Sequence, residues 1–257
     1  MLMYEMQLPN GLFVQQLSPG ETALLYRDIF TERCYAHERL SLNAGDTVFD
    51  VGANIGMAAL FFHLECPGLV FHAFEPAPEP YSALTANLTM HGIIASSTRC
   101  ALGDRSGIGQ LTYYPDSTVM SGFYADVEAE ASLTRSYLTR SGFDEEDVRE
   151  MLVGRHESVV VGCEVQTLSD VIAARRVERI NLLKLDVEKS ELDVLRGLRE
   201  QDWPKVRQVV AEVHDINGAL KSFTGLLEAH GFDVELEQDD LLSGTEIYEV
   251  FAFRKDH

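Results

Sequence analysis

The sequence predicts an α/β protein with a mostly parallel β-sheet and helices on both of its faces. Three observations support this prediction. From Thr47 onward, short runs of β-branched and aromatic residues alternate with stretches whose apolar residues recur at helical spacing. The stretch TVFDVGANIG, at 47–56, has the form of a strand that passes through a glycine-containing turn into a helix. The chain ends in two neighbouring strand-like runs, which suggest an antiparallel strand at one edge of the sheet.

The elements can be placed in chain order. The turn Pro9-Asn10-Gly11 predicts a small β-hairpin, and apolar residues at helical spacing predict a helix over about 22–40. The predicted strands then cover 47–51, 69–74, 96–102, 109–114, 159–165, 180–187, 206–213, 232–238 and 246–254, and the predicted helices cover 57–65, 79–91, 168–174, 191–199 and 219–230.

We expect a single domain over residues 1–257. Residues 1–45, the hairpin and first helix, are expected to cover the pocket. The segment 115–157 is an insertion of charged and amphipathic character, with short helices predicted at 133–139 and 145–152. Insertions of this length are usually functional lids or disordered segments, so a substrate lid is favoured over a passive surface insertion.

The composition excludes several classes of function. A formal net charge of −20 repels phosphate backbones, so no nucleic-acid partner is expected. No apolar run approaches the ~18 residues of a membrane span, and the first residues are not expected to form a signal peptide. The four cysteines, Cys34, Cys66, Cys100 and Cys163, are far apart and indicate reduced, structural thiols. We therefore expect a cytoplasmic protein without a membrane partner.

The turn after the strand at 47–51 indicates the kind of ligand. In open α/β sheets, ligands bind beyond the carboxyl ends of the strands. Asp50 lies at such an end, while Gly52 and Gly56 let the backbone approach a ligand closely. A dinucleotide fingerprint would require glycine at Asn54 and Met57, so a nicotinamide enzyme is disfavoured. The acid before the turn would repel a pyrophosphate and suits a cationic ligand such as S-adenosylmethionine.

Glu75 marks the end of the next strand. It follows 69–74 directly, roughly 20 residues beyond the glycine turn, where an acid can accept hydrogen bonds from both hydroxyls of a ribose. The alternative is that Glu75 only caps the following helix. Together with the turn at 50–52, the ribose role is favoured.

At these motifs the sequence resembles the FkbM-type methyltransferases, which transfer a methyl group from S-adenosylmethionine. The resemblance runs from about Ile29 to Phe253. It implies a Rossmann-like class I methyltransferase fold with a seven-stranded sheet, and many enzymes of this family methylate hydroxyl groups of natural products or sugars. The motifs that carry it, in the order and at about the spacing of the family, are VFDVGANIG, AFEPAPEPYSALTANL, ALGD and LLKLDVEKSELDVLRG.

The resemblance implies three groups of cofactor contacts. In similar enzymes the glycine turn contacts the methionine part, the acid after the second strand holds the ribose, and the turn after the third strand lies near adenine. The corresponding residues are Asp50, Gly52, Ala53, Asn54 and Gly56 for the methionine part, Glu75 and Pro76 for the ribose, and Ala101 and Leu102, with Gly103 and Asp104, for adenine.

The fourth strand of the sheet ends in LKLDVEKSE. The family pattern here is Asp-x-Glu-Gly-x-Glu, which Asp186, Glu188 and Glu191 match, whereas Lys189 stands where glycine is usual. Because lysine prefers ordinary φ angles, this turn is expected to differ, which weakens the assignment of Glu188. Asp186 ends a very apolar strand and is expected to point toward the reactive end of the cofactor.

The fifth strand ends in AEVHD and places Glu212 and His214 beside Asp186. Methyl transfer is an in-line attack, and the enzyme's main task is to hold the nucleophile in place. Histidine, with a pKa near 6.5, can take the proton of a hydroxyl, so His214 is predicted to be the general base and a neighbouring acid to orient it. A surface histidine at a strand end is the alternative.

The same cluster is also consistent with a metal site. Asp186, Glu212 and His214 offer oxygen and nitrogen ligands, and Mg²⁺ could hold a deprotonated oxygen there, as in some related O-methyltransferases. The Asp-Asn pair that those enzymes carry after the fifth strand is missing, so the metal-free route is favoured.

Substrate contacts are predicted from aromatic residues near the pocket. Tyr35 and His37 precede the strand at 47–51, and Tyr124 borders the insertion; His37 is also a conceivable second base. The sequence thus predicts O-methylation of a small natural-product, sugar or carrier-tethered metabolite. An N-methyltransferase and a catalytically silent cofactor-binding protein remain alternatives, and the oligomeric state is undetermined.

Overall fold

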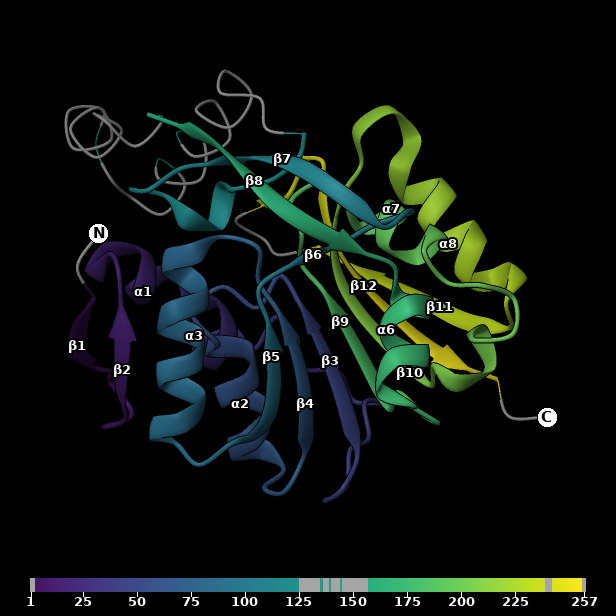
Figure 1. Ribbon diagram of the computed structural model, residues 1–257, viewed down its shortest axis with the longest axis horizontal. Helices are drawn as coiled ribbons and strands as arrows, with labels where there is room; N and C mark the ends of the chain where they lie inside the picture. Colours follow the sequence, from purple (N-terminus) through teal and green to yellow (C-terminus); the bar gives the residue numbers. More distant parts are fainter. Residues whose placement is uncertain are drawn as a thin grey trace.

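The computed structural model describes residues 3–124, 157–238 and 242–255, together with the single residues 135, 139 and 144. It consists of a central sheet with helices on both faces and a smaller sheet at one end (Figure 1). The segment 115–157, predicted as a lid, lies within the described residues only in its first and last parts. The helices predicted at 133–139 and 145–152 fall almost wholly outside them.

The central sheet has seven strands in the order β11-β12-β10-β9-β3-β4-β5. Strand β12 is antiparallel to both of its neighbours, whereas the neighbouring pairs from β10 to β5 are parallel. The predicted mostly parallel sheet with antiparallel pairing at one edge is therefore confirmed. The antiparallel strand, β12, lies second from that edge, next to β11. The strands are β3 (Thr47–Val51), β4 (Val70–Phe74), β5 (Ile94–Thr98), β9 (Leu182–Leu185), β10 (Gln208–His214), β11 (Phe232–Glu237) and β12 (Ile247–Arg254).

Two apolar cores lie on the two faces of this sheet. Successive side chains of a strand point to opposite faces, so Val48 joins one core and Phe49 the other. Helices on each face close these cores, as Figure 1 shows. The first face carries α2 (Met57–Glu65) and α3 (Pro78–Met90), and the second carries α6 (Leu168–Arg175), α7 (Glu191–Arg196) and α8 (Ala219–Ala229).

A three-stranded sheet, β6-β8-β7, forms a separate layer. It contains β6 (Ala101–Leu102), β7 (Gly107–Tyr113) and β8 (Val159–Gln166). The prediction of one strand over 96–102 is wrong, because β5 ends at Thr98 and β6 pairs with β8 instead of continuing the large sheet. One face of β8 packs on a small apolar cluster, while Val160 on the other face is 65% exposed.

The predicted hairpin is confirmed as β1 (Tyr4–Gln7) and β2 (Phe13–Gln16), which pair antiparallel. It lies beside α3, against which β2 packs. No helix in the described ranges is both long enough and apolar enough to cross a bilayer.

The helix predicted over 22–40 starts earlier and is much shorter. Helix α1 (Pro19–Tyr26) begins after Ser18, whose side chain accepts a hydrogen bond from the Glu21 amide, and it continues into a π-helical turn, η1 (Arg27–Thr31). Arg33 then adopts a left-handed backbone with φ of 59°, which ends the helical path. The chain from here to β3 is irregular and brings Tyr35 to the central site.

Candidate functional site

A cavity of about 280 Å³ lies beyond the carboxyl ends of β3, β4 and β9. Its walls come from the turn after β3, the residues after β4, strand β6 and the loop after β9. Residues of α1 and η1 and the stretch 117–123 also line it, as do Cys34, Tyr35, Cys100, Leu111, Glu212 and Leu242. This is the crevice in which ligands of open α/β sheets bind.

Gly52 brings two strand ends into direct contact. Its φ is +73°, and a Cβ at this position would lie 1.7 Å from the carbonyl oxygen of Asp186. Gly56, at the start of α2, has φ of +90°, and a Cβ there would lie 2.9 Å from Cδ1 of Leu84. Both glycines are thus required by packing within the chain: a side chain at Gly52 would force β3 and β9 apart, and one at Gly56 would press against Leu84 of α3. Gly52 lines the cavity, whereas Gly56 does not.

Asp50 does not line the cavity. Its side chain is 1% exposed, and its Oδ1 lies 3.1 Å from Nζ of Lys184 on the neighbouring strand. The same ammonium group donates to the Gly52 carbonyl at 2.8 Å and lies 3.7 Å from Oδ2 of Asp186. The sequence analysis placed Asp50 against a cationic cofactor; the structure instead pairs it with a buried lysine behind the turn. Ala53 is likewise buried outside the cavity lining.

Sequence reasoning missed Lys184. The available signal was a lysine in the middle of the apolar stretch NLLKLDV. A buried lysine requires a carboxylate partner, and parallel pairing places it opposite Asp50.

Glu75 is held at the cavity wall by two backbone amides. Its Oε2 accepts a hydrogen bond from the Asn54 amide at 2.9 Å, and its Oε1 accepts one from the Ala77 amide at 2.9 Å. Burial raises the pKa of Glu75 to about 7, although the two amides and Lys184 oppose this shift. The bond to Ala77 also serves the start of α3, so the capping role and the ribose role are compatible.

The other predicted contacts near Glu75 share its part of the cavity. Pro76, Ala101 and Leu102 line the same space as Gly52 and Asn54. Six of the residues that the family resemblance implies for the cofactor therefore line the cavity, whereas Asp50, Ala53, Gly56, Gly103 and Asp104 do not.

A chain of hydrogen bonds joins the glycine turn to α1. Asn54 Nδ2 donates to Thr118 Oγ1 at 2.9 Å, and that hydroxyl donates to Glu21 Oε1 at 2.8 Å. The Val119 amide donates to the same carboxylate oxygen at 2.6 Å. The N-terminal helix and the first part of the 115–157 segment are thereby fixed to the turn. The sequence offered no signal for this contact, because Glu21 has the ordinary form of an acid in the first turn of a helix.

Asp186 lies in the cavity with its side chain 27% exposed. The hydroxyl of Tyr35 donates to its Oδ2 at 2.7 Å. Burial, together with the charge of Asp186, raises the pKa of Tyr35 well above its usual value, so the phenol keeps its proton and remains a donor. Tyr35, predicted to contact substrate, therefore also holds Asp186 in position.

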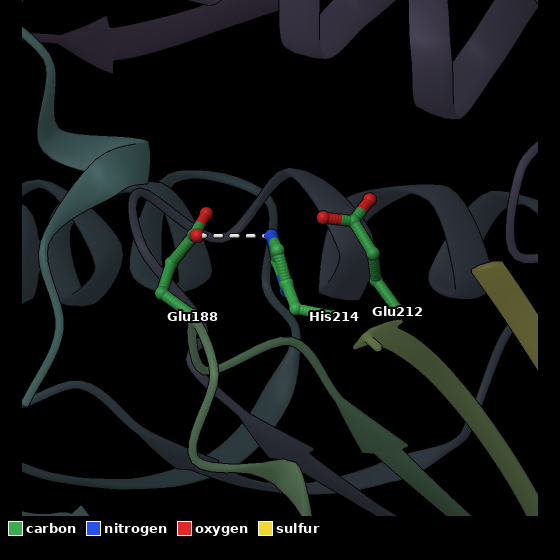
Figure 2. A group of neighbouring side chains, drawn as sticks. All are labelled: Glu188, Glu212 and His214. Atoms are coloured by element: carbon green, nitrogen blue, oxygen red, sulfur yellow. Dashed lines mark ion pairs between the residues drawn. The ribbon is translucent and has the colours of Figure 1, made fainter. Parts of the chain in front are cut away.

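Glu188, Glu212 and His214 come together where β9 and β10 end (Figure 2). His214 Nε2 lies 3.4 Å from Glu188 Oε2, and its Nδ1 lies 3.9 Å from Oε1 of Glu191. Burial lowers the pKa of His214, but the carboxylates of Glu191, Glu188 and Glu212 outweigh this effect and raise it to about 10. At neutral pH the imidazole is charged, which argues against the predicted role of general base.

The loop after β9, which carries Glu188, has an unusual backbone. Glu188 has φ of 49° and Lys189 has φ of 74°, so two successive residues are left-handed. The expectation that Lys189 would avoid the backbone of the usual glycine is wrong. Such residues cost on the order of 1–2 kcal/mol each and tend to occur at functional sites.

His37 and Tyr124 lie away from the cavity lining. His37 is buried against Phe251, with Nε2 3.3 Å from Oε2 of Glu235. Tyr124 is 56% exposed and donates to Asp193 at 2.7 Å. The structure thus gives no contact between these two residues and the site that they were predicted to cover.

The apolar wall of the cavity was not predicted. It comes from Leu24, Leu25 and Ile29 on α1 and η1, with Val119 and Met120 beside them. The first helix was expected to cover the pocket, but the residues that would face a ligand were not named, because spacing alone does not say which side of a helix faces a ligand.

Comparison with known proteins gives a consistent result. The sequence profile described as the methyltransferase FkbM domain matches residues 50–234. The chain is 50% identical over 253 residues to the 31-O-demethyl-FK506 methyltransferase FkbM of Streptomyces tacrolimicus, covering 97% of this chain and 96% of that protein. It is also 35% identical over 263 residues to the AMB antimetabolite synthetase AmbE of Pseudomonas aeruginosa, covering 97% of this chain and 12% of that protein.

A solved structure supports the fold. The methyltransferase FkbM from Methylobacillus flagellatus superposes with a TM-score of 0.54 at 14% identity, covering 83% of this chain and 45% of that one.

The buried pair of Asp50 and Lys184 predicts a large effect on stability. We expect Lys184→Met to lower the free energy of unfolding by about 3–5 kcal/mol, because it leaves the Asp50 carboxylate buried without a cation. Urea denaturation measures the loss, and Lys255→Met, at an exposed lysine, is the matched control. The double variant Asp50→Asn, Lys184→Met should lose less than the single variant. Equal effects of Lys184→Met and Lys255→Met would contradict this account.

Proposed function

The chain belongs to the FkbM methyltransferase family, and we propose that it transfers the methyl group of S-adenosylmethionine to a hydroxyl group of a natural product. One observation carries the proposal for the site. The side-chain-free turn at Gly52 and the oriented carboxylate of Glu75 face one cavity at the switch point of the sheet. A nucleoside with a compact, charged tail fits this combination.

The lining suggests how the cofactor lies. The Glu75 carboxylate can accept hydrogen bonds from the ribose hydroxyls, since its two amide partners already fix its orientation. Ala101 and Leu102 offer small and apolar surface for the adenine. The methionine part then follows the bare backbone at Gly52. Its positive sulfur is directed toward Asp186, which takes the role that the sequence analysis gave to Asp50.

The reaction requires one bond to form as another breaks. The acceptor oxygen attacks the methyl carbon in line with the carbon–sulfur bond, whose electron pair stays on sulfur to give S-adenosylhomocysteine. The hydroxyl proton must leave, and the imidazole of His214 cannot accept it because the ring is already protonated at neutral pH. We assign this proton to Asp186, which lines the cavity and is held by Tyr35 through one carboxylate oxygen.

The acceptor side of the cavity favours an apolar molecule. Leu24, Leu25 and Ile29 line the cavity, together with the acids Glu21 and Asp28 of the same elements, and these apolar side chains favour an acceptor with a hydrocarbon body. The relative from Streptomyces tacrolimicus is named for methylation of 31-O-demethyl-FK506, an O-methylation. We therefore favour an oxygen acceptor on a natural product over an amine.

A direct test uses the methyl-labelled cofactor. Incubated with hydroxylated natural products, the protein should release S-adenosylhomocysteine and transfer the labelled methyl group to an oxygen. The label should then resist alkaline hydrolysis, because it is held as a methyl ether and not as a methyl ester. Calorimetry should give binding of S-adenosylhomocysteine in one site per chain. Binding of NAD without binding of S-adenosylhomocysteine would overturn the proposal.

The pKa of Glu75 predicts how cofactor binding depends on pH. Binding favours the ionised carboxylate, so affinity for S-adenosylhomocysteine should fall as the pH drops below about 7, approaching tenfold per pH unit, and binding should release a proton there. Calorimetry in buffers of different ionisation enthalpy measures both effects. In Glu75→Gln the free energy of S-adenosylhomocysteine binding should be weaker by about 1–3 kcal/mol at pH 8, and the pH dependence of binding should vanish. An unchanged pH profile in Glu75→Gln would refute the assignment.

Asp186→Asn should lower kcat about 10²–10⁴-fold, because the amide cannot take the proton. Tyr35→Phe, which removes only the hydrogen bond to Asp186, should lower kcat much less. Single-turnover kinetics with labelled cofactor measure the chemical step in both variants. Full activity of Asp186→Asn would remove this residue from the mechanism.

A further inference from the structure

We propose that Glu188, Glu212 and His214 bind one divalent cation of the Mg²⁺ and Mn²⁺ class, which fixes the acceptor oxygen for methyl transfer. The role of the cation rests on the proposed function, whereas the site itself rests on side-chain geometry. The set differs from the one that the sequence suggested, because Glu188 takes the place of Asp186.

The three side chains converge on one point. They come from two neighbouring strand ends, and Figure 2 shows their polar groups directed to the same side, with the imidazole between the two carboxylates. One ligand atom from each lies within 4.8 Å of the others. With metal–oxygen distances of about 2.1 Å, adjacent ligands of an octahedral ion lie about 3.0 Å apart and opposite ones about 4.2 Å. Only small side-chain shifts are needed to close the site.

Glu191 supplies the second layer of such a site. Its Oε1 accepts a hydrogen bond from the Lys189 amide at 2.9 Å and lies 3.9 Å from Nδ1 of His214. That ring nitrogen is buried and makes no hydrogen bond within the part of the chain that the structure describes. Histidines that bind a metal through one nitrogen usually donate the other N–H to a carboxylate. With Nε2 on the cation, His214 would present Nδ1–H to Glu191.

A second buried polar group also lacks a partner here. Ser190 is 3% exposed and lines the cavity, yet its Oγ has no hydrogen bond to any described residue. A buried hydroxyl in this state costs about 1–3 kcal/mol. A water molecule on an open coordination position of the cation would satisfy it.

The charges around the cluster favour a dication. Glu188, Glu191 and Glu212 act on the imidazole, and Asp186 acts on Glu212, while Lys184 pairs with Asp50 and Asp186 behind the turn. Two carboxylates and one imidazole suit Mg²⁺ or Mn²⁺ better than a metal that prefers thiolates.

The position of the site explains its use. Glu188 and Glu212 line the cavity, so the open coordination positions face the space for the acceptor. A hydroxyl bound to the cation loses its proton more readily, and its oxygen is held for in-line attack. Asp186, outside the ligand set, remains available to take that proton.

Mn²⁺ is the probe for the test. Protein treated with EDTA and then dialysed is titrated with Mn²⁺, and electron paramagnetic resonance measures the free ion. One Mn²⁺ should bind per chain and be displaced by Mg²⁺, and pulsed measurements should detect one directly bound imidazole nitrogen. His214→Gln should abolish that nitrogen signal, and Glu188→Gln and Glu212→Gln should each weaken binding at least tenfold.

Two comparisons make the result specific. Asp186→Asn, which removes a neighbouring charge but no proposed ligand, should weaken Mn²⁺ binding only a few-fold, whereas Glu191→Gln should weaken it about 10–100-fold. Circular dichroism and thermal unfolding of every variant in EDTA should match those of the unaltered chain, which shows that they are folded. No binding of Mn²⁺ to the unaltered chain, or equal losses in Glu188→Gln and Asp186→Asn, would overturn the site. If the unaltered chain did not bind S-adenosylhomocysteine, this would instead overturn the proposed function.

Discussion

The close approach of β3 and β9 is the constraint on which the site depends. At Gly52 there is no room for a Cβ because the carbonyl of Asp186 occupies that space. Lys184 ties the same junction together, since its ammonium group contacts the Asp50 carboxylate and the Gly52 carbonyl at once. Contacts within the chain therefore hold the turn in place, and the acid at the end of β9 is fixed beside it. A buried ion pair of this kind is useful for the geometry that it imposes more than for net stability.

Once this junction is fixed, the acidic edge of the sheet follows from the topology. Parallel strands end at the same edge, so the acids after β9 and the acid and histidine at the end of β10 must meet. Glu188 follows β9 by three residues, and it and Lys189 both adopt a left-handed backbone there. The opposite part of the cavity is apolar or neutral around Ala101 and Leu102. Under the proposed function, these two parts of the cavity would separate recognition of the nucleoside from the chemistry at sulfur.

Much of this arrangement could be predicted from the sequence, and the failures have specific causes. The strand and helix periods located β3, α2 and β4, and the motifs identified Gly52, Glu75 and Asp186 as cavity residues, because turn chemistry and strand ends are local properties. The roles of Lys184 and Glu21 were missed since each depends on a partner that is distant in the chain. His37 failed for the same reason: its neighbours on β11 and β12 are far away in sequence. Local patterns cannot say which of several nearby aromatics or histidines will face a ligand.

The most instructive failure concerns the charge of His214, because residue type and protonation state are different kinds of information. A histidine at a strand end suggests a base only if its pKa stays near that of a free imidazole. Here burial acts to lower the pKa, but three glutamates raise it to about 10, and one of them, Glu188, lies in a loop whose left-handed backbone no local pattern revealed. The same three acids that remove the base role make the imidazole a good ligand, because a cation can replace the proton on Nε2 and satisfy the carboxylates as well. A histidine surrounded by carboxylates is thus better explained as a ligand of a cation than as a general base.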